Sequence, residues 1–211
     1  MRKFPRIYPI LDSSFIPAGD RSLFLRNLGS ALSQAGVTLL EYRNKNAGDE
    51  AILTDTETLR RAMPNARLIL DDRADLVARA GFDGVHVDAG DVTLTEARRL
   101  LGPDRIVGTF GGSESLVPGV LDEPADYFSI GPVFATTTKQ TEKRPIGAEG
   151  VRRLREQAGP DAVLVAAAGI TLETAPEVIA AGASIVAVAA SLFTQPDPAA
   201  EFRKWIDVLG Q

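Results

Sequence analysis

Three features of the sequence predict an α/β protein built as a single (β/α)8 barrel over residues 1–211. First, short β-rich runs alternate with helical patterns from one end of the 211-residue chain to the other. Second, the strand-like runs number eight, and each is followed by a helix or by the remnant of one. Third, several of the runs are apolar without interruption, which is typical of parallel strands covered by helices. No linker or break in composition indicates a second domain.

The eight predicted strands are spread evenly along the chain. They are IYPILD (7–12), TLLEYR (38–43), RLILDD (67–72), GVHVD (84–88), RIVGTF (105–110), YFSIGPVF (127–134), AVLVAAAG (162–169) and SIVAVAAS (184–191). Helical periodicity is found at 24–36, 53–63, 75–81, 93–102, 150–159, 172–182 and 199–210. The helix expected after 105–110 has the weakest pattern, because SESLVPGVL is short and contains Pro118.

Three junctions between a helix and a strand resemble one another. SQAGVTLL, ARAGFDGVHV and AAGASIVAV each end a helix with Ala-Gly and then enter a strand, and glycine at that point suits a left-handed helix C-cap. The alternative fold is an open doubly wound sheet, which usually has a glycine-rich turn after its first strand. Here SSFIPAGD follows IYPILD, so the barrel is favoured.

Composition excludes several classes of function. The chain has no cysteine and one histidine, His86, so disulfides, thiolate catalysis and cysteine- or multi-histidine metal sites are excluded. A bound metal would need oxygen ligands, which favours Mg²⁺. The net charge of −5 argues against a nucleic-acid partner, and no apolar run is long enough for a membrane span. We therefore expect a cytoplasmic protein that contacts neither nucleic acid nor membrane.

Ionisable side chains collect where predicted strands end, and in a barrel those ends carry the functional loops. The second strand runs into Glu41, Arg43 and Lys45, which alternate onto one side of the chain. The two cations are suited to bind an anion. Lys45 could alternatively be an ordinary solvated loop residue.

Carboxylates follow the third and fourth strands. Asp71 and Asp72 end the third strand, and Asp91 follows the fourth. Paired carboxylates beside a cationic rim are a usual way to hold Mg²⁺ against a diphosphate. The alternative for Asp71 or Asp72 is a purely structural one, as the cap of the next helix.

The stretch GPVFATTTK (131–139) follows the sixth strand. It places Thr136 and Thr138 beside Lys139, and hydroxyl donors next to a cation suit a phosphate or diphosphate, although an ordinary turn has a similar composition. Glycine and small residues, Gly169 and Ala189-Ala190, leave the last two strands, where this fold commonly binds phosphate.

His86 lies within the apolar run GVHV, which favours a hydrogen-bonded residue of the barrel interior over a catalytic base. No G-x-S-x-G motif accompanies it, so a serine–histidine hydrolase is not expected.

The chain resembles the thiamine phosphate synthase family. The similarity rests on GVTLLEYRNK, LILDDRADLVARAGFDGVHV with Asp91 and LTEARRLLG after it, ADYFSIGPVFATTTK, and AAGITLET followed by VIAAGASIVAV. These segments recur in order at similar spacings and cover nearly the whole chain. Members join hydroxymethylpyrimidine diphosphate to a thiazole phosphate on a (β/α)8 barrel with Mg²⁺, releasing diphosphate. The resemblance implies small phosphorylated substrates as partners and leaves a homo-oligomer open.

Roles for individual residues follow from the resemblance. Arg43, Lys45 and Lys139 are similar to the cations that bind the diphosphate, and Asp72 and Asp91 to the Mg²⁺ carboxylates. The expected substrate-binding residues are Glu41, Asp71, Phe110, Thr136, Thr138, Gly169, Ala189 and Ala190. Of these, the two threonines and the backbone around Gly169 and Ala190 would hold the thiazole phosphate.

Several positions depart from the family pattern, and four of them are expected substrate-binding residues. The family has Gln at Glu41, Asn at Asp71, and Ser at Phe110 and at Ala190. Two added charges near a diphosphate would each cost a kcal/mol or more by an order-of-magnitude estimate, unless a second metal offsets them. Two alternatives therefore stay open: a thiazole tautomerase, and a relative that binds thiazole phosphate without turnover.

Overall fold

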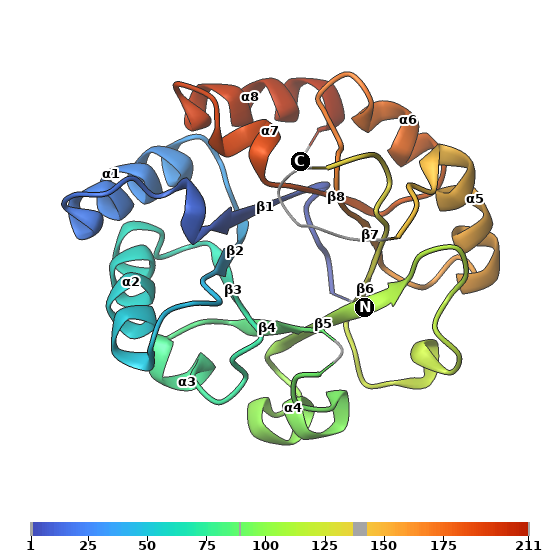
Figure 1. The fold of residues 1–211 in the computed structure, drawn as a ribbon, viewed down its shortest axis with the longest axis horizontal. Coiled ribbons are helices and arrows are strands. Elements are labelled where there is room, and N and C mark those ends of the chain that lie inside the picture. Colours follow the sequence, from blue (N-terminus) through green and yellow to red (C-terminus); the bar gives the residue numbers. More distant parts are fainter. Residues whose placement is uncertain (1, 89, 137–142, 211) are drawn as a thin grey trace.

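The eight strands form one closed parallel barrel in the order β1 to β8, which confirms the predicted fold class (Figure 1). The computed structural model describes residues 2–88, 90–136 and 143–210. The strands are β1 (Ile7–Asp12), β2 (Leu39–Arg43), β3 (Arg67–Asp71), β4 (Gly84–Val87), β5 (Ile106–Gly112), β6 (Tyr127–Ile130), β7 (Leu164–Ala166) and β8 (Ile185–Val188). Each predicted strand is present, and several are shorter than the sequence suggests.

Helices surround the ring of strands on its outside (Figure 1). They are α1 (Arg21–Gln34), α2 (Asp49–Ala62), α3 (Val77–Ala80), α4 (Leu94–Leu101), α5 (Gly147–Ala158), α6 (Ala175–Ala180), α7 (Ala190–Phe193) and α8 (Pro198–Leu209), with 3-10 turns η1 (Ser13–Phe15) and η2 (Val120–Asp122). Between β5 and β6 the chain makes only η2, in agreement with the weak helical pattern there. Within the described ranges, no helix is both long and apolar enough to cross a membrane.

The prediction for the last strand was wrong at its carboxyl end. The expected strand ran to Ser191, but β8 stops at Val188 and α7 begins at Ala190. Small residues such as Ala189 and Ala190 fit either structure, so the apolar pattern alone does not mark the boundary. These two alanines are half-buried and line the main cavity.

Apolar side chains pack in two separate layers. Inside the barrel, alternate residues of the strands meet in one cluster: Tyr8, Leu39, Ile69, Ile106, Tyr127, Val165, Ile185 and Ala187. Their neighbours along each strand point outward and pack beneath the helices in a second, larger cluster. The centre of the barrel is therefore filled by side chains.

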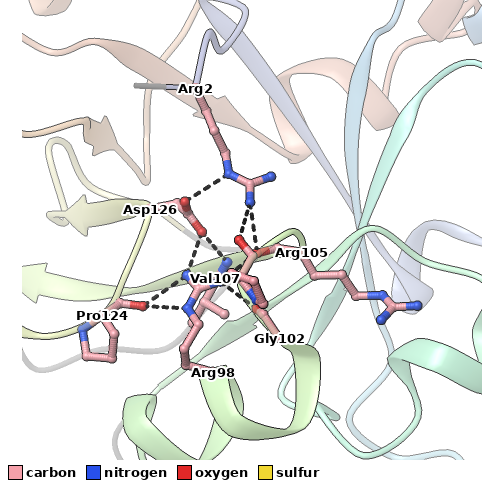
Figure 2. Close-up of polar contacts among 8 residues, drawn as sticks. Arg2, Arg98, Gly102, Arg105, Val107, Pro124 and Asp126 are labelled. Atoms are coloured by element: carbon pink, nitrogen blue, oxygen red, sulfur yellow. Dashed lines mark hydrogen bonds and ion pairs between the residues drawn. The ribbon is translucent and has the colours of Figure 1, made fainter.

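An arginine clamp ties the amino-terminal ends of β5 and β6 together (Figure 2). Arg98 of α4 donates to Asp126 at 2.8 Å and to the carbonyl of Arg105 at 2.7 Å. The same Asp126 oxygen accepts the backbone N–H of Val107 at 2.9 Å, and its other oxygen pairs with Arg2 at 3.0 Å. One carboxylate thus joins a helix, two strand starts and the amino-terminal segment.

The same clamp recurs twice more around the barrel. Arg60 of α2 pairs with Asp83, which accepts a backbone N–H at the start of β3 at 2.8 Å. Arg155 of α5 donates to Ser184 at 2.9 Å, and Ser184 accepts a backbone N–H of β7 at 3.2 Å. Asp83 and Ser184 lie within two of the similar Ala-Gly junctions of the sequence. At these two junctions, the similar sequence accompanies the same contact between an arginine and a side chain that accepts a strand N–H. Gly81 also forms the left-handed helix cap, with φ of 65°.

We expect Asp126→Ala to lower the free energy of unfolding by roughly 1–3 kcal/mol, because it leaves the buried N–H of Val107 without its acceptor and removes the carboxylate partner of Arg98. Urea unfolding, followed by the fluorescence of the single tryptophan, Trp205, measures this. Glu96→Ala is the matched control, since it breaks an exposed pair with Arg99 on α4 and should cost no more than about 0.5 kcal/mol. Equal losses in the two variants would contradict a structural role for the clamp.

Candidate active site

A cavity of about 760 Å³ opens at the carboxyl ends of the strands. Its lining includes eight of the predicted site residues: Glu41, Arg43, Asp71, Phe110, Thr136, Gly169, Ala189 and Ala190. Lys45, Asp72 and Asp91 lie beside it, on the loops that follow β2, β3 and β4. Thr138 and Lys139 lie outside the described residues. The closed barrel therefore brings together residues from most of the chain.

The two predicted cations of β2 and its loop are held by carboxylates. Arg43 pairs with Asp12 at the end of β1, and its Nε lies 3.3 Å from Asp71 Oδ2. Lys45 Nζ lies 2.5 Å from Asp72 Oδ2 and 3.5 Å from Asp71 Oδ2. Burial alone would lower the pKa of Arg43, but Asp71 and Asp12 outweigh it and raise the pKa. Both side chains are thus charged and positioned before any anion enters.

Asp71 lies at the centre of this cluster and has an unusual pKa. Burial, followed by the nearby charges of Glu41 and Asp72, raises its pKa to about 7 against the opposing effect of Lys45. Among the described residues, none donates a hydrogen bond of good geometry to its Oδ2, which forms two longer ion pairs with Arg43 and Lys45. The carboxyl group is therefore poised to exchange a proton near neutral pH.

Glu41 points into a buried polar network on the floor of the cavity. Tyr8 donates to Glu41 Oε2 at 2.8 Å, and the hydroxyls of Tyr8 and Tyr127 lie 3.0 Å apart. Tyr127 in turn contacts His86 Nδ1 at 3.1 Å, and its ring fills the space left by Gly108, where a Cβ would lie 1.9 Å from the ring. Burial raises the pKa of Glu41. His86 is thus a hydrogen-bonded residue of the barrel interior, as predicted.

Asp72 and Asp91 form a carboxylate pair beside the cavity. Asp91 accepts the N–H of Asp88 at 2.8 Å, and partial burial together with Asp72 raises its pKa. Asp72 Oδ1 is buried and accepts no hydrogen bond from the described residues. A carboxylate oxygen without a donor, next to a second carboxylate, has the chemistry that a hard cation requires.

Backbone geometry supports a functional role for Asp72. Its φ of 64° lies in the left-handed region, which aspartate tolerates better than most residues and which is common at functional sites. The alternative that Asp71 or Asp72 caps a helix is wrong, because α3 begins after Leu76 and has no side-chain cap. Among the described residues, no group of three or more acidic or histidine side chains could hold a metal. The pair would need ligands from the substrate or water to complete a metal's coordination.

The opposite wall of the cavity is built from small residues and backbone. Gly169 has a φ of 69°, and a Cβ there would lie 2.4 Å from the carbonyl oxygen of Ala135. Only glycine lets the loop after β7 approach the loop that carries Thr136 this closely. Ala168, with φ of 74°, continues the same tight turn. Thr136, Gly169 and Ala190 all line the cavity, and their role as a phosphate site stays a prediction.

The lining residues that were not predicted include Tyr8, Asp12, Asp88, Tyr127 and Lys143. Asp12 could have been found, because it ends the first predicted strand in the way that Asp71 ends the third. Burial raises its pKa, but hydrogen bonds from Ser14 and the charge of Arg43 outweigh burial and lower it. Tyr8 and Tyr127 lie within apolar strand patterns, so nothing in the sequence indicated that they line the cavity.

The fold and this cavity define a (β/α)8 barrel with a charged cavity at the carboxyl ends of its strands. A family model described as thiamine monophosphate synthase matches residues 7–192. The thiamine-phosphate synthase of Koribacter versatilis is 39% identical over 195 residues, and the alignment covers 92% of this chain and 92% of that protein. The thiamine-phosphate synthase of Agrobacterium fabrum is 36% identical over 210 residues, and the alignment covers 96% of this chain and 94% of that protein. The chain belongs to the thiamine monophosphate synthase family.

Solved structures agree with this assignment. A thiamine phosphate pyrophosphorylase from Pyrococcus furiosus superposes with a TM-score of 0.78 at 26% identity, covering 97% of this chain and 95% of that one. The resemblance inferred from the sequence motifs is thereby confirmed.

We expect Asp71→Asn to become progressively more stable than wild type as the pH rises. The pKa of about 7 in the folded state exceeds that of a free carboxyl, about 4, so ionisation favours the unfolded chain in this interval. Urea unfolding from about pH 5 to about pH 8 measures the difference between the two proteins, which should level off above pH 7.

Asp12→Asn is the control for this experiment. Because the pKa of Asp12 is lowered, its contribution to stability is complete above about pH 4. Its difference from wild type should therefore be flat over the tested range. A flat difference for Asp71→Asn as well would show that Asp71 titrates normally.

Proposed function

We propose that this protein is a thiamine-phosphate synthase, a transferase that joins hydroxymethylpyrimidine diphosphate to thiazole phosphate. The bond between the pyrimidine methylene carbon and the diphosphate oxygen breaks, and its electron pair leaves with the diphosphate. The lone pair of the thiazole nitrogen then forms the new carbon–nitrogen bond. Family membership carries this proposal, together with the positions of Arg43 and Lys45 beside the cavity.

The residues of the cavity suit stabilisation of a leaving group. The aminopyrimidine ring can delocalise the positive charge that develops on its methylene carbon, so the protein need not supply a nucleophile. Charge grows instead on the departing diphosphate, where fixed cations act most strongly. Arg43 and Lys45 are held in place by carboxylates on β1 and β3, and this preorganisation avoids the cost of ordering them during the reaction.

We further propose that Asp72 and Asp91 hold Mg²⁺ when the diphosphate is bound. Mg²⁺ usually binds through one or two carboxylates and completes its shell with water and substrate phosphates, which matches a two-carboxylate site. The ion would supply Lewis-acid stabilisation of the leaving oxygens. The buried Oδ1 of Asp72, which accepts no hydrogen bond within the described ranges, supports this role.

A cytoplasmic location and a homo-oligomeric assembly stay predictions. So do the thiazole-phosphate contacts of Thr136 and of the backbone at Gly169 and Ala190, although their shared position on one wall supports them.

An assay of diphosphate release in the presence of both substrates and Mg²⁺ tests the proposed function. We expect diphosphate and thiamine phosphate to form in equal amounts, and no diphosphate release when the thiazole phosphate is replaced by buffer. A wild-type protein that binds thiazole phosphate but neither binds nor releases diphosphate would instead be a non-catalytic relative.

Replacement of Asp72 or Asp91 by Asn should lower kcat/KM by at least about tenfold and raise the Mg²⁺ concentration needed for half-maximal rate, since each removes a charged ligand. Calorimetric titration of Mg²⁺ with diphosphate present should show the same weakening without turnover. Asp88→Asn is a control, because Asp91 accepts the backbone N–H of Asp88, which this substitution keeps. Unchanged Mg²⁺ dependence in both variants would overturn the metal assignment.

A further inference from the structure

A buried polar cluster joins β2 to the first two helices on the outer side of the barrel wall. Its centre is Tyr42, which alternates with the cavity-lining Glu41 and Arg43 along β2 and packs in the layer beneath the helices. The Tyr42 hydroxyl donates a hydrogen bond to Asp55 of α2, and Arg21 at the start of α1 donates to the same carboxylate oxygen at 2.7 Å. Tyr42 and Asp55 are both almost completely buried, so the cluster ties the end of one strand to two helices.

The hydrogen bonds of the Tyr42 hydroxyl have fixed directions. Burial, and then the hydrogen bond to Asp55, raises the pKa of Tyr42 to about 12, so the phenol keeps its proton and donates it to Asp55. A phenol has one proton, and its oxygen can otherwise only accept. It accepts from Arg21 at 3.2 Å and from the side-chain amide nitrogen of Asn44 at 3.0 Å. Asn44 is thus bound to an oxygen atom that two helices hold in place.

Asn44 connects this cluster to the loop that carries Lys45. It is the first residue after β2 and directly precedes Lys45 in the chain. The ammonium group of Lys45 is held at the cavity by Asp71 and Asp72. The side chain of Asn44 holds the same loop from the outer side of the barrel wall, through Tyr42. The loop is therefore fixed from two sides.

Only the inner of these two contacts competes with an anion. A diphosphate that approaches Lys45 draws its ammonium group away from Asp71 and Asp72, so the inner contacts weaken when the anion binds. Tyr42 and Asn44 do not line the cavity, and their hydrogen bond stays in place in the bound state. Because the loop is ordered before binding, the entropy of ordering it does not subtract from the affinity for the anion.

We propose that Tyr42 and Asn44 are positioning residues for the diphosphate leaving group, because they fix the loop that presents Lys45 to it. Asp55 and Arg21 support them by holding the Tyr42 hydroxyl. This inference rests on the proposed function and extends it to residues that do not touch the substrate, since none of these four side chains lines the cavity. Their effect on the reaction therefore passes through Lys45.

The first test compares Asn44→Ala with Asn65→Ala. Asn44→Ala removes the link to the loop and leaves the hydrogen bond between Tyr42 and Asp55 in place. We expect it to weaken calorimetric binding of inorganic diphosphate with Mg²⁺ by about five- to tenfold, as for the loss of order in one loop residue. Asn65 is an exposed residue between α2 and β3, so the same substitution there should change binding less than about twofold. Unchanged diphosphate binding in Asn44→Ala would overturn the proposal.

Tyr42→Phe tests the same role from inside the cluster. It keeps the ring and removes the hydroxyl, so both Asn44 and Asp55 lose their partner, and diphosphate binding should weaken at least as much as in Asn44→Ala. This variant also destabilises the fold. Asp126→Ala separates the two effects, because it destabilises the opposite end of the barrel, and it should bind diphosphate within about twofold of wild type. Equal weakening in Asp126→Ala would show that binding merely follows stability, against the proposal.

Steady-state kinetics shows which substrate is affected. In Asn44→Ala, kcat/KM for the pyrimidine diphosphate should fall by about the same five- to tenfold factor, while the KM for thiazole phosphate changes less than about twofold. An equal rise in the KM of both substrates would indicate a general loss of structure and contradict the positioning role. Failure of the proposed function looks different: wild type itself would then neither bind nor release diphosphate, and the positioning role would fall with it.

A double-mutant cycle with Lys45→Ala tests whether the effect passes through Lys45. Once the ammonium group is absent, the order of its loop matters less, so adding Asn44→Ala to Lys45→Ala should weaken diphosphate binding by less than about twofold. Strict additivity of the two effects would show that Asn44 does not act through Lys45 and would overturn the assignment. Unfolding followed by Trp205 fluorescence verifies that each variant is folded.

Discussion

Closure of the parallel sheet is the constraint on which the site depends. Because every strand runs in the same direction and β8 pairs with β1, all eight carboxyl ends meet at one rim. Asp12 and Arg43 are placed side by side by the register of β1 on β2, and Asp71 faces His86 by the register of β3 on β4. No single loop contains a functional cluster. The cluster exists only while the ring is closed, and the three arginine clamps hold the opposite end of that ring.

The rim is crowded with charges of both signs, and this crowding sets its chemistry. Asp71 lies near Glu41 and Asp72 as well as near Arg43 and Lys45, so its pKa reflects repulsion and burial more than attraction. The carboxylates that position Arg43 and Lys45 also neutralise part of their positive charge. An incoming diphosphate must compete with Asp12, Asp71 and Asp72, and a metal bound by the last of these would turn a competitor into a ligand.

The strand pattern and the sorting of polar residues to strand ends predicted most of the barrel and its functional end. They succeeded because alternation and apolar runs reflect burial on a sheet, and because parallel strands share one functional edge. The predicted end of the last strand was wrong, because an alanine-rich sequence fits a strand and a helix equally well, and β8 ends earlier, at Val188. Tyr8, Tyr127 and Lys143 could not be predicted, because their roles arise from contacts between elements that are distant in sequence. The partners of Glu41 depend on the same kind of contact.

The two carboxyl groups that depart from the family pattern oppose a diphosphate less than their formal charges imply. Glu41 is turned into the floor of the barrel, where Tyr8 holds it and burial raises its pKa. Asp71 has a pKa of about 7, so near neutral pH about half of its population carries a proton. A protonated carboxyl group has nearly the shape of the amide that the family carries at these positions, with one donor and one acceptor. Entry of an anion beside Asp71 would raise its pKa further and favour that neutral form. The raised pKa values make the added acids proton-dependent polar groups, and the recruitment of a second metal to offset their charge stays a prediction.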